Sequence, residues 1–440
     1  MTMLHTPPKQ PTLPEVHRSI PIPNVKSFWR KLFAFAGPGY LVSVGYMDPG
    51  NWATDIAGGA QFGYTLLFVI MLSNLMAILL QSLCVRLSVA TERDLAQACR
   101  DYYSRRVAIF LWVLCEVAIA ACDLAEVVGS AIALQLLFGI PLTWGVCLTI
   151  LDVLVLLLVQ RHGFRYIEAL IITLVSTIGI CFVAEMIFSR PDLGGVFQGF
   201  VPTAELVQNP AKLYIAIGIL GATVMPHNLY LHSAIIQTRN WQRTSEKKWE
   251  AIKFGSLDST IALCFALFIN AAILIVSAAT FHVSGNQHVA EIEEAYKLLS
   301  PLMGVHLASF LFAVALLASG QSSTMTGTLA GQIVMEGFVN LRLPPWLRRL
   351  ISRLLAIIPA LICIVLFGEG STTNLLILSQ VILSLQLSFA VFPLVMFTSD
   401  RRIMGEFVNP GWLKILAWLV AILIGGLNAW LLIQTVLEWL

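Results

Sequence analysis

The sequence predicts an all-α polytopic membrane protein, and three observations lead to this fold class. The chain has 440 residues, of which 58% are hydrophobic and only 12% are charged, about half the charge of a soluble domain. Apolar runs long enough for a helix to cross a bilayer recur throughout. Two runs in matching positions are interrupted by proline beside polar side chains. We expect eleven transmembrane helices, over residues 32–58, 64–90, 107–137, 142–160, 166–188, 211–236, 254–281, 301–338, 346–367, 373–397 and 411–436.

The placement of Lys and Arg gives the expected orientation. If the N-terminus lies inside, all but three of the 27 Lys and Arg fall at the inner ends of the spans, the exceptions being Arg190, Lys212 and Lys297. Because cytoplasmic loops carry the excess of positive charge, this pattern predicts a multi-pass protein of the cell inner membrane with a cytoplasmic N-terminus and an extracytoplasmic C-terminus. The lipid bilayer is the expected surrounding. There is no nucleic-acid signature, and no obligatory protein partner is expected.

The chain divides into four expected parts. Residues 1–28 hold six prolines and no long apolar run, which predicts a disordered cytoplasmic tail rather than a signal peptide. Residues 29–190 and 191–398 would form two units of five helices each, and residues 399–440 an additional eleventh helix.

The first interruption is Asp48-Pro49-Gly50-Asn51. Proline lacks the amide hydrogen that a helix interior needs, and glycine loses the most backbone entropy there, so the helix should break. Backbone groups freed inside hydrocarbon must find partners, and an aspartate there costs about 2.5–3.5 kcal/mol. The combination favours a site for an ion or a polar substrate. The alternative is a proline kink with a hydrogen-bonded aspartate.

The second interruption, Gly221 to Asn228, contains Met225-Pro226-His227 and lies five spans after the first. Five is odd, so a second unit of five helices would start from the opposite side of the membrane. Transporters often carry such inverted repeats with paired broken helices. The spacing therefore predicts an inverted 5+5 repeat whose helices 1 and 6 are both broken.

The two breaks offer an expected set of metal ligands. Oxygen atoms with one soft sulfur suit Mn²⁺ or Fe²⁺ better than Ca²⁺ or Mg²⁺. Methionine in a membrane helix is ordinarily a packing residue, but its place beside Pro226 favours a ligand. Gln380 is a further candidate, with helix–helix hydrogen bonding as the alternative. The expected donors are the Asp48 carboxylate, the Asn51 amide oxygen, the Met225 thioether and the backbone carbonyls of Gly45 and Ala222.

A second group of side chains predicts proton transfer. An unperturbed histidine titrates near neutrality, so His227 and His232 could carry protons, although each also fits a hydrogen-bonded core histidine. Glu116, Asp123 and Glu126 are spaced by seven and three residues, which places them on one helix face. Arginines at the start of the ninth span, among them Arg348 and Arg349, could pair with these carboxylates, so a proton relay and structural salt bridges both remain open.

Together these motifs resemble the NRAMP family of proton-coupled divalent metal transporters. The resemblance rests on both interruptions and on Gly37-Pro38-Gly39, Asp123-Leu124-Ala125-Glu126, residues 313–321 and Leu378-Ser379-Gln380-Val381. It implies the LeuT-type fold, a metal held by the five donors named above, and proton handling by Asp48, Asp123, Glu126, His227 or His232. The chain departs from the family pattern at Gly45, where alanine is frequent, and at Ser388, where proline is common.

The sequence therefore predicts a proton-coupled importer of Mn²⁺ and Fe²⁺ that works by alternating access and is not an enzyme. No permanently bound cofactor is expected, because the metal ion and the protons are transported. Two other classes stay open. A sodium-coupled organic-solute transporter on the same fold would leave Met225 unused. An intramembrane metalloenzyme would need a general base beside a metal-bound water, which His227 and His232, five residues apart, do not supply.

Overall fold

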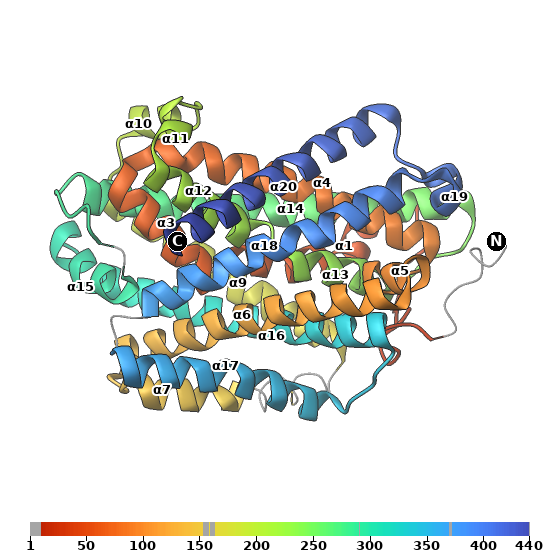
Figure 1. The fold of residues 1–440 in the computed structure, drawn as a ribbon, viewed down its shortest axis with the longest axis horizontal. Coiled ribbons are helices and arrows are strands. Elements are labelled where there is room, and N and C mark those ends of the chain that lie inside the picture. The colour runs from red at the N-terminus through yellow and green to blue at the C-terminus, as the bar shows by residue number, and fades with distance from the viewer. Residues whose placement is uncertain (1–9, 153–157, 159–162, 290, 369–371, 440) are drawn as a thin grey trace.

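The computed structural model describes residues 10–152, 158, 163–289, 291–368 and 372–439. Most of the helices run along the long axis of the molecule and form one bundle (Figure 1). The first half contains β1 Ile20–Pro21, α1 Phe28–Phe35, α2 Pro38–Val44, η1 Gly45–Met47, α3 Pro49–Phe62, η2 Gly63–Leu66, α4 Leu67–Thr91, α5 Leu95–Tyr102, α6 Arg105–Phe138, α7 Leu142–Leu148, η3 Thr149–Leu151 and α9 Phe164–Ser189. The second half contains α10 Leu193–Gly199, α11 Glu205–Gln208, α12 Pro210–Thr223, α13 Pro226–Ile235, η4 Ile236–Thr238, β2 Arg239–Asn240, α14 Ser245–Ser277, η5 Ala278–His282, α15 Ile292–Met303, α16 Leu307–Val339, α17 Pro345–Phe367, α18 Thr372–Ser399, α19 Arg401–Met404, η7 Gly405–Phe407 and α20 Gly411–Trp439.

The helices agree with the eleven expected spans. Within the described residues, nine helical stretches are long and apolar enough to cross a membrane. One of them, Pro49–Thr91, contains both α3 and α4, which are separated by a turn at Gly63 with φ +62°. The shorter apolar helix Leu142–Leu151 begins the expected fourth span. Most of the remainder of that span, residues 153–157 and 159–160, lies outside the described residues.

The first span starts later than expected. Residues 28–35 form the separate helix α1, and the chain turns at Gly37, whose φ of +135° is accessible to glycine. The membrane helix then begins at Pro38. Asp258 of α14 accepts hydrogen bonds from the backbone N–H groups of Gly37 (3.4 Å) and Gly39 (2.7 Å), so a side chain from another helix satisfies its free amides. The eighth span is likewise α16, which starts at Leu307 rather than residue 301.

The expectation of a disordered tail does not hold for residues 10–27. Thr12 donates to Asp94 (2.8 Å), and the Leu13 amide donates to Glu336 (3.0 Å) in a buried contact. Ile20–Pro21 pairs in parallel with Arg239–Asn240 as a two-stranded sheet. These contacts tie the tail to α5, α16 and the end of the sixth span. Proline-rich composition missed them because the partners are distant in sequence.

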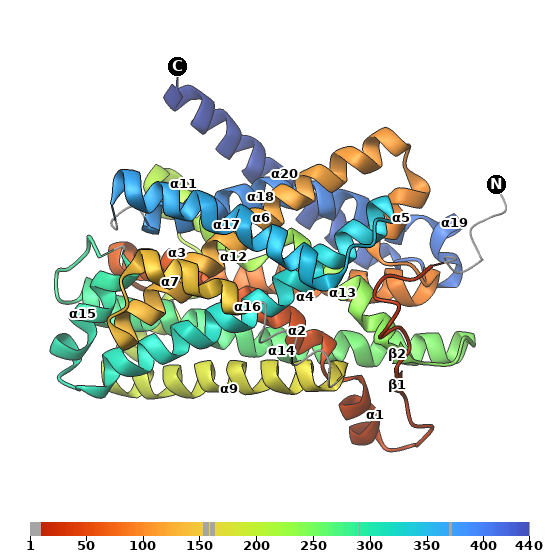
Figure 2. The ribbon, with the colours of Figure 1, turned by 90° about the horizontal axis from the view of Figure 1, so that it is seen from below.

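The two ends of the bundle carry different segments. The N-terminal segment, α5 and α19 lie at one end of the long axis, while α10, α11 and α15 lie at the other (Figures 1 and 2). The last turns of α20 lie toward the end opposite residues 10–27 (Figures 1 and 2). This arrangement agrees with the prediction that successive connecting segments lie at alternate ends of the helices.

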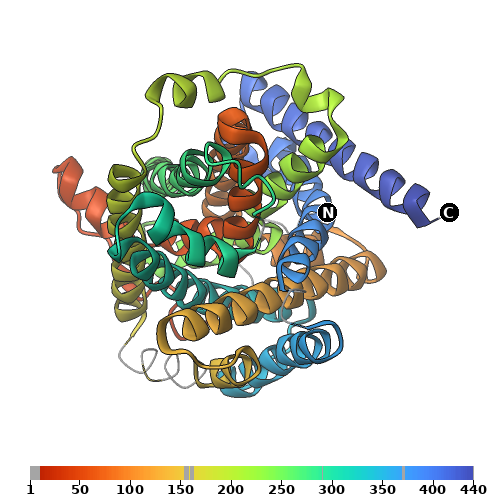
Figure 3. The ribbon, with the colours of Figure 1, turned by 90° about the vertical axis from the view of Figure 1, so that its left-hand side faces the viewer.

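The middle of the bundle is built around α6 and α16. These two helices pack against each other, and α18 and α17 both pack on α6, with α7 beside α17 (Figure 3). On the other side α14 packs on α2, α3 and α4. The broken helices thus lie between two groups of continuous helices.

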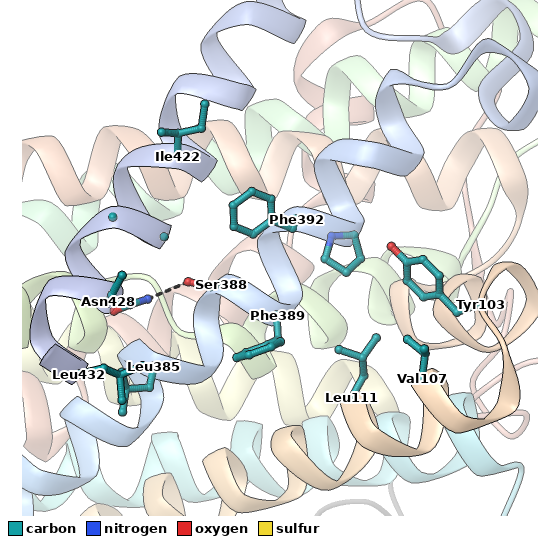
Figure 4. Close-up of a pocket in the computed structure, with 14 residues that line it drawn as sticks. Tyr103, Val107, Leu111, Leu385, Ser388, Phe389, Phe392, Ile422, Asn428 and Leu432 are labelled. Atoms are coloured by element: carbon teal, nitrogen blue, oxygen red, sulfur yellow. Dashed lines mark hydrogen bonds between the residues drawn. The ribbon is translucent and has the colours of Figure 1, made fainter. Parts of the chain in front are cut away.

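A mostly apolar groove of about 670 Å³ lies between α6, α18 and α20 (Figure 4). Beside it, Asn428 of α20 donates to Ser388 Oγ (2.9 Å) and to the Ser384 carbonyl (2.6 Å). The serine at position 388 therefore joins α18 to α20, and α18 is helical throughout Thr372–Ser399. None of the expected metal ligands lines this groove.

A buried ion pair joins three segments next to the first turn. Arg239 lies 2.6 Å from Glu168 of α9, both side chains being almost completely buried. Arg239 also donates to the carbonyl of Ala36, between α1 and α2. Arg165, which is about half exposed, bonds the other oxygen of Glu168 at 3.0 Å. The sixth span, α9 and the entry to the first span are therefore held together by charge.

Arg239→Met should lower the free energy of unfolding by about 3–5 kcal/mol, because it leaves the buried Glu168 carboxylate without its main partner. Thermal unfolding of the purified protein in detergent measures the change. The control is Arg165→Met, at a more exposed pair, for which we expect about 0–1 kcal/mol. Equal losses for the two variants would contradict this account.

Candidate metal site

The first break is a change of helix type followed by a new helix start. After η1, Asp48 has extended backbone angles (φ −68°, ψ 165°), and α3 begins at Pro49. Asp48 is the N-cap of α3, and its carboxylate accepts the Asn51 amide at 2.8 Å. Proline is favoured in the first helical turn because its missing N–H would be unpaired there anyway. The motif therefore restarts a helix in the middle of the span.

Nearby helices bond most of the carbonyls that this break frees. The carbonyl of Tyr46 accepts from Asn270 of α14 at 2.7 Å. That of Met47 accepts from the Trp52 indole at 3.2 Å and from Ser319 of α16. The Gly45 carbonyl remains directed at the Asn51 amide, at 3.3 Å. This backbone oxygen is one of those predicted as ligands.

The second break separates α12 from α13. The helix ends at Thr223, Val224 and Met225 have non-helical angles (φ −101°, ψ 78° and φ −75°, ψ 127°), and α13 starts at Pro226. Proline again occupies the first helical position. Because α12 packs against α3 and η1, the two breaks lie side by side.

Three of the predicted ligand oxygens converge on one point. The Asn51 side-chain nitrogen donates to Asp48 Oδ1 at 2.7 Å, to the Ala222 carbonyl at 3.1 Å and to the Gly45 carbonyl at 3.3 Å. The amide nitrogen thus occupies the place that a cation bound by these oxygens would take. A half turn of the carboxamide would instead present its oxygen to that point. The geometry brings together four of the five expected donor residues.

The site is deeply buried and carries negative charge. Asp48 is 0% exposed and Asn51 1%. Asp48 Oδ2 has no hydrogen-bond partner among the described residues. A buried carboxylate is costly unless a cation or hydrogen bonds compensate it, so the donor set fits a positive ligand.

Met225, the fifth expected donor, forms a small buried cluster with Ala118 and Cys122 of α6 and Leu383 of α18. Met225 lies at the break itself, and its side chain also packs in this apolar cluster. Gln380 of α18 lies against the first break. A Cβ added to Gly50 would collide with the amide nitrogen of Gln380. Gly50 is therefore required for close approach, and Gln380 lies against the Asp48–Asn51 turn.

The two histidines have different surroundings. His232 Nδ1 bonds Gln81 Oε1 at 2.9 Å, and the Gln81 amide donates to the Tyr46 hydroxyl at 2.9 Å. A buried chain of polar groups thus links the sixth span, α4 and the first span. His227 Nε2 lies 3.8 Å from Cys122 Sγ, which in turn lies 3.5 Å from Glu126. His227 is therefore the histidine placed between the second break and the α6 carboxylates.

The α6 carboxylates do face one another and the predicted arginine segment. A Cβ on Gly327 of α16 would meet Glu126 Oε1 at 3.0 Å and Asp123 Oδ1 at 3.3 Å, so both carboxylates lie against the same point of α16. Glu126 accepts from Ser323 at 2.8 Å, and Arg353 approaches it to 3.9 Å.

Further along α6, Arg348 pairs with Glu116 at 3.2 Å. Arg353 also lies 3.7 Å from Asp152. The side chain of Arg349 lies outside those described. Of the two α17 arginines whose side chains are described, Arg353 is thus the one beside the deeper carboxylates, a distinction that sequence spacing alone did not make.

Several polar residues at the site were missed by sequence reasoning, namely Tyr46, Gln81, Cys122, Asn228 and Asn270. The available signal was that amides and a histidine recur in otherwise apolar spans, where they need partners. Among the described residues, no group of three or more His, Cys, Asp or Glu could hold a metal. A metal here would depend on amide, thioether and carbonyl donors.

Comparison with known proteins agrees with this geometry. The sequence profile described as "Nramp: Natural resistance-associated macrophage protein-like" matches residues 39–434. A relative from Nostoc sp. (strain PCC 7120), named divalent metal cation transporter MntH, is 76% identical over 436 residues, covering 99% of each chain. One of the same name from Mesorhizobium japonicum is 61% identical over 427 residues, covering 97% of this chain and 94% of the relative.

Solved structures give the same result. The Eremococcus coleocola manganese transporter, in complex with an aromatic bis-isothiourea substituted compound, is 44% identical with a TM-score of 0.90, covering 95% of this chain and 90% of that one. Mhp1, a nucleobase-cation-symport-1 family transporter, has a TM-score of 0.57 at 14% identity, covering 90% of this chain and 92% of that one, which shows the fold alone. The predicted LeuT-type helical membrane fold is confirmed. Because the profile spans most of the chain and relatives at 61% and 76% identity cover nearly all of it, the chain belongs to the Nramp family.

Proposed function

We propose that this protein imports divalent transition metal ions, Mn²⁺ first and Fe²⁺ second, together with protons and by alternating access. The observation that carries the proposal is the convergence of Asp48 Oδ1 and the carbonyls of Gly45 and Ala222 on one buried point between the two breaks. The names of the relatives support it: divalent metal cation transporter, and manganese transporter for the solved structure.

The metal ion is the substrate, and each donor has a separate task. Asp48 supplies the negative charge, and the two carbonyls replace part of the hydration shell of the ion. Asn51 contributes its amide oxygen once the ion displaces its nitrogen from this point. Met225 provides a soft donor that favours a transition metal over Mg²⁺ or Ca²⁺, since a thioether adds nothing for a hard cation.

Protons would follow the polar face of α6. Asp48 is the first acceptor, and the path continues past His227 and Cys122 to Asp123 and Glu126. Glu116 and Arg348 extend it toward the start of α6. Because the arginines of α17 stabilise carboxylates in their charged form, they would keep these groups ready to accept a proton.

Alternating access requires the broken helices to move against a fixed group. The helices of the third, fourth, eighth and ninth spans, α6, α7, α16 and α17, pack on one another and form the proposed scaffold. The Tyr46–Gln81–His232 chain and the β1–β2 pair join the broken helices to neighbouring segments, and in the proposed mechanism these contacts would close one side of the site. We place that side in the cytoplasm, since it carries the N-terminal segment and the predicted inner loops.

A sodium-coupled organic-solute transporter is the competing function on this fold. It would leave Met225 without a role and would bind its substrate through free backbone amides. Competition of amino acids, rather than of metal ions, with uptake would identify it.

Asp48→Ala should reduce Mn²⁺ uptake into proteoliposomes to background, because it removes the only carboxylate at the point of convergence within the described residues. The matched control is Glu185→Ala, a buried α9 carboxylate whose oxygens lack partners in the described part of the chain. Near-normal uptake by Asp48→Ala would refute the metal-site assignment.

Met225→Ala should weaken discrimination against Mg²⁺ and Ca²⁺ by about tenfold, or ~1.4 kcal/mol, while Mn²⁺ transport falls less. Mn²⁺ uptake with those ions in excess measures the selectivity. The control is Met76→Ala, which truncates a buried methionine elsewhere in the bundle, in α4. Unchanged selectivity would rule out the thioether as a ligand.

Glu126→Gln should lower the number of protons that enter with each metal ion, because the amide keeps the hydrogen bond to Ser323 but cannot carry a proton. Mn²⁺ uptake recorded together with an internal pH dye gives this ratio, with Glu185→Gln as control. If the ratio stays at the wild-type value, the α6 carboxylates are structural.

A further inference from the structure

The side chain of Asn228 is buried without a protein partner. It lies in the first turn of α13, three residues after Met225, and is 0% exposed. Among the described residues, neither its amide nitrogen nor its amide oxygen has a hydrogen-bond partner. Native proteins bond nearly all such groups to protein or ordered water, so the amide is expected to have a partner that is not part of the chain.

Asn228 lies directly against Gly45, the residue whose carbonyl belongs to the site. A Cβ on Gly45 would overlap the amide nitrogen of Asn228 and come within 3.1 Å of its Cγ and 3.2 Å of its Oδ1. Gly45 therefore makes the space that Asn228 fills, which gives a physical reason for glycine at this position. The two broken helices meet here through this pair.

The coordination number of the ion points to a water in this place. The five expected donors, from Asp48, Asn51, Met225, Gly45 and Ala222, leave an octahedral ion such as Mn²⁺ with one further position, to be filled by a water or by the further candidate Gln380. A metal-bound water is a strong hydrogen-bond donor, and an amide oxygen is a suitable acceptor for it. Polar groups that orient metal-bound ligands in this way tune metal affinity.

We propose that Asn228 is a positioning residue that hydrogen-bonds a water molecule bound to the transported divalent cation, next to the Gly45 carbonyl. The inference rests on the proposed function, because it requires the metal to bind between the two breaks. Asn228 is not among the expected ligands. Its proposed role explains why Asn228 packs so closely against Gly45.

The test is Asn228→Leu, which removes the amide at nearly constant volume. Isothermal titration of the purified full-length protein with MnCl₂ should give roughly 10- to 100-fold weaker binding than wild type. Without metal, the melting temperature should stay the same or rise, because an unpaired buried amide has been replaced by an apolar group. A purely structural hydrogen bond would instead make it fall.

Two further variants sharpen the test. Asn74→Leu removes another buried asparagine of the described helices, in α4, whose amide nitrogen has no partner there, and should leave Mn²⁺ affinity unchanged. Gly45→Ala should lower both stability and affinity by the collision with Asn228. Adding Asn228→Ala to Gly45→Ala should restore the melting temperature but not the affinity.

The outcomes separate this inference from the proposed function. Wild-type affinity in Asn228→Leu, or a melting temperature several degrees lower without metal, would overturn the role of Asn228. If the wild type binds no Mn²⁺, or if Asp48→Ala binds it as well as the wild type, the proposed metal site itself fails.

Discussion

The structure depends on one constraint, namely that backbone groups freed inside an apolar bundle must be bonded. Two helices break at proline, at Pro49 and Pro226, and each break releases carbonyls far from water. Side chains from α14 and α16 bond those of Tyr46 and Met47. The Gly45 carbonyl accepts only from the Asn51 side-chain amide among the bonds described above. The carbonyls bonded by other helices are therefore structural, whereas that of Gly45 can bind a cation.

The chemical type of the polar groups around the breaks changes with distance from the site. Nearest are amides and a carboxylate, which are oxygen donors for a metal. One helix further away, α6 and α17 carry acidic and basic side chains that face one another, with Arg353 near Glu126 and Arg348 on Glu116. The candidate metal donors and the acidic side chains of α6 are thus separate but contiguous groups, as the proposed coupling of an ion to a proton would require.

Charge also fixes the end of the bundle where the N-terminal segment lies. The Arg239–Glu168 pair holds the end of the sixth span to α9 and to the entry of the first span. The tail adds hydrogen bonds to Asp94 and Glu336. In this structure both broken helices are therefore joined to continuous helices at the same end, and the proposed alternating access would require these contacts to rearrange.

The sequence by itself determined the membrane class, the positions of both breaks and four of the expected donor residues, which the structure brings together there. These follow from local chemistry, since an apolar run, a proline and a carboxylate have the same consequences in any fold. Only the tertiary structure decided which carbonyls stay available, that Arg353 rather than Arg348 reaches Glu126, that residues 10–27 are bound, and that Asn228 lies against Gly45. These facts depend on contacts between segments distant in the chain, and such contacts are set by helix packing, which no local pattern encodes.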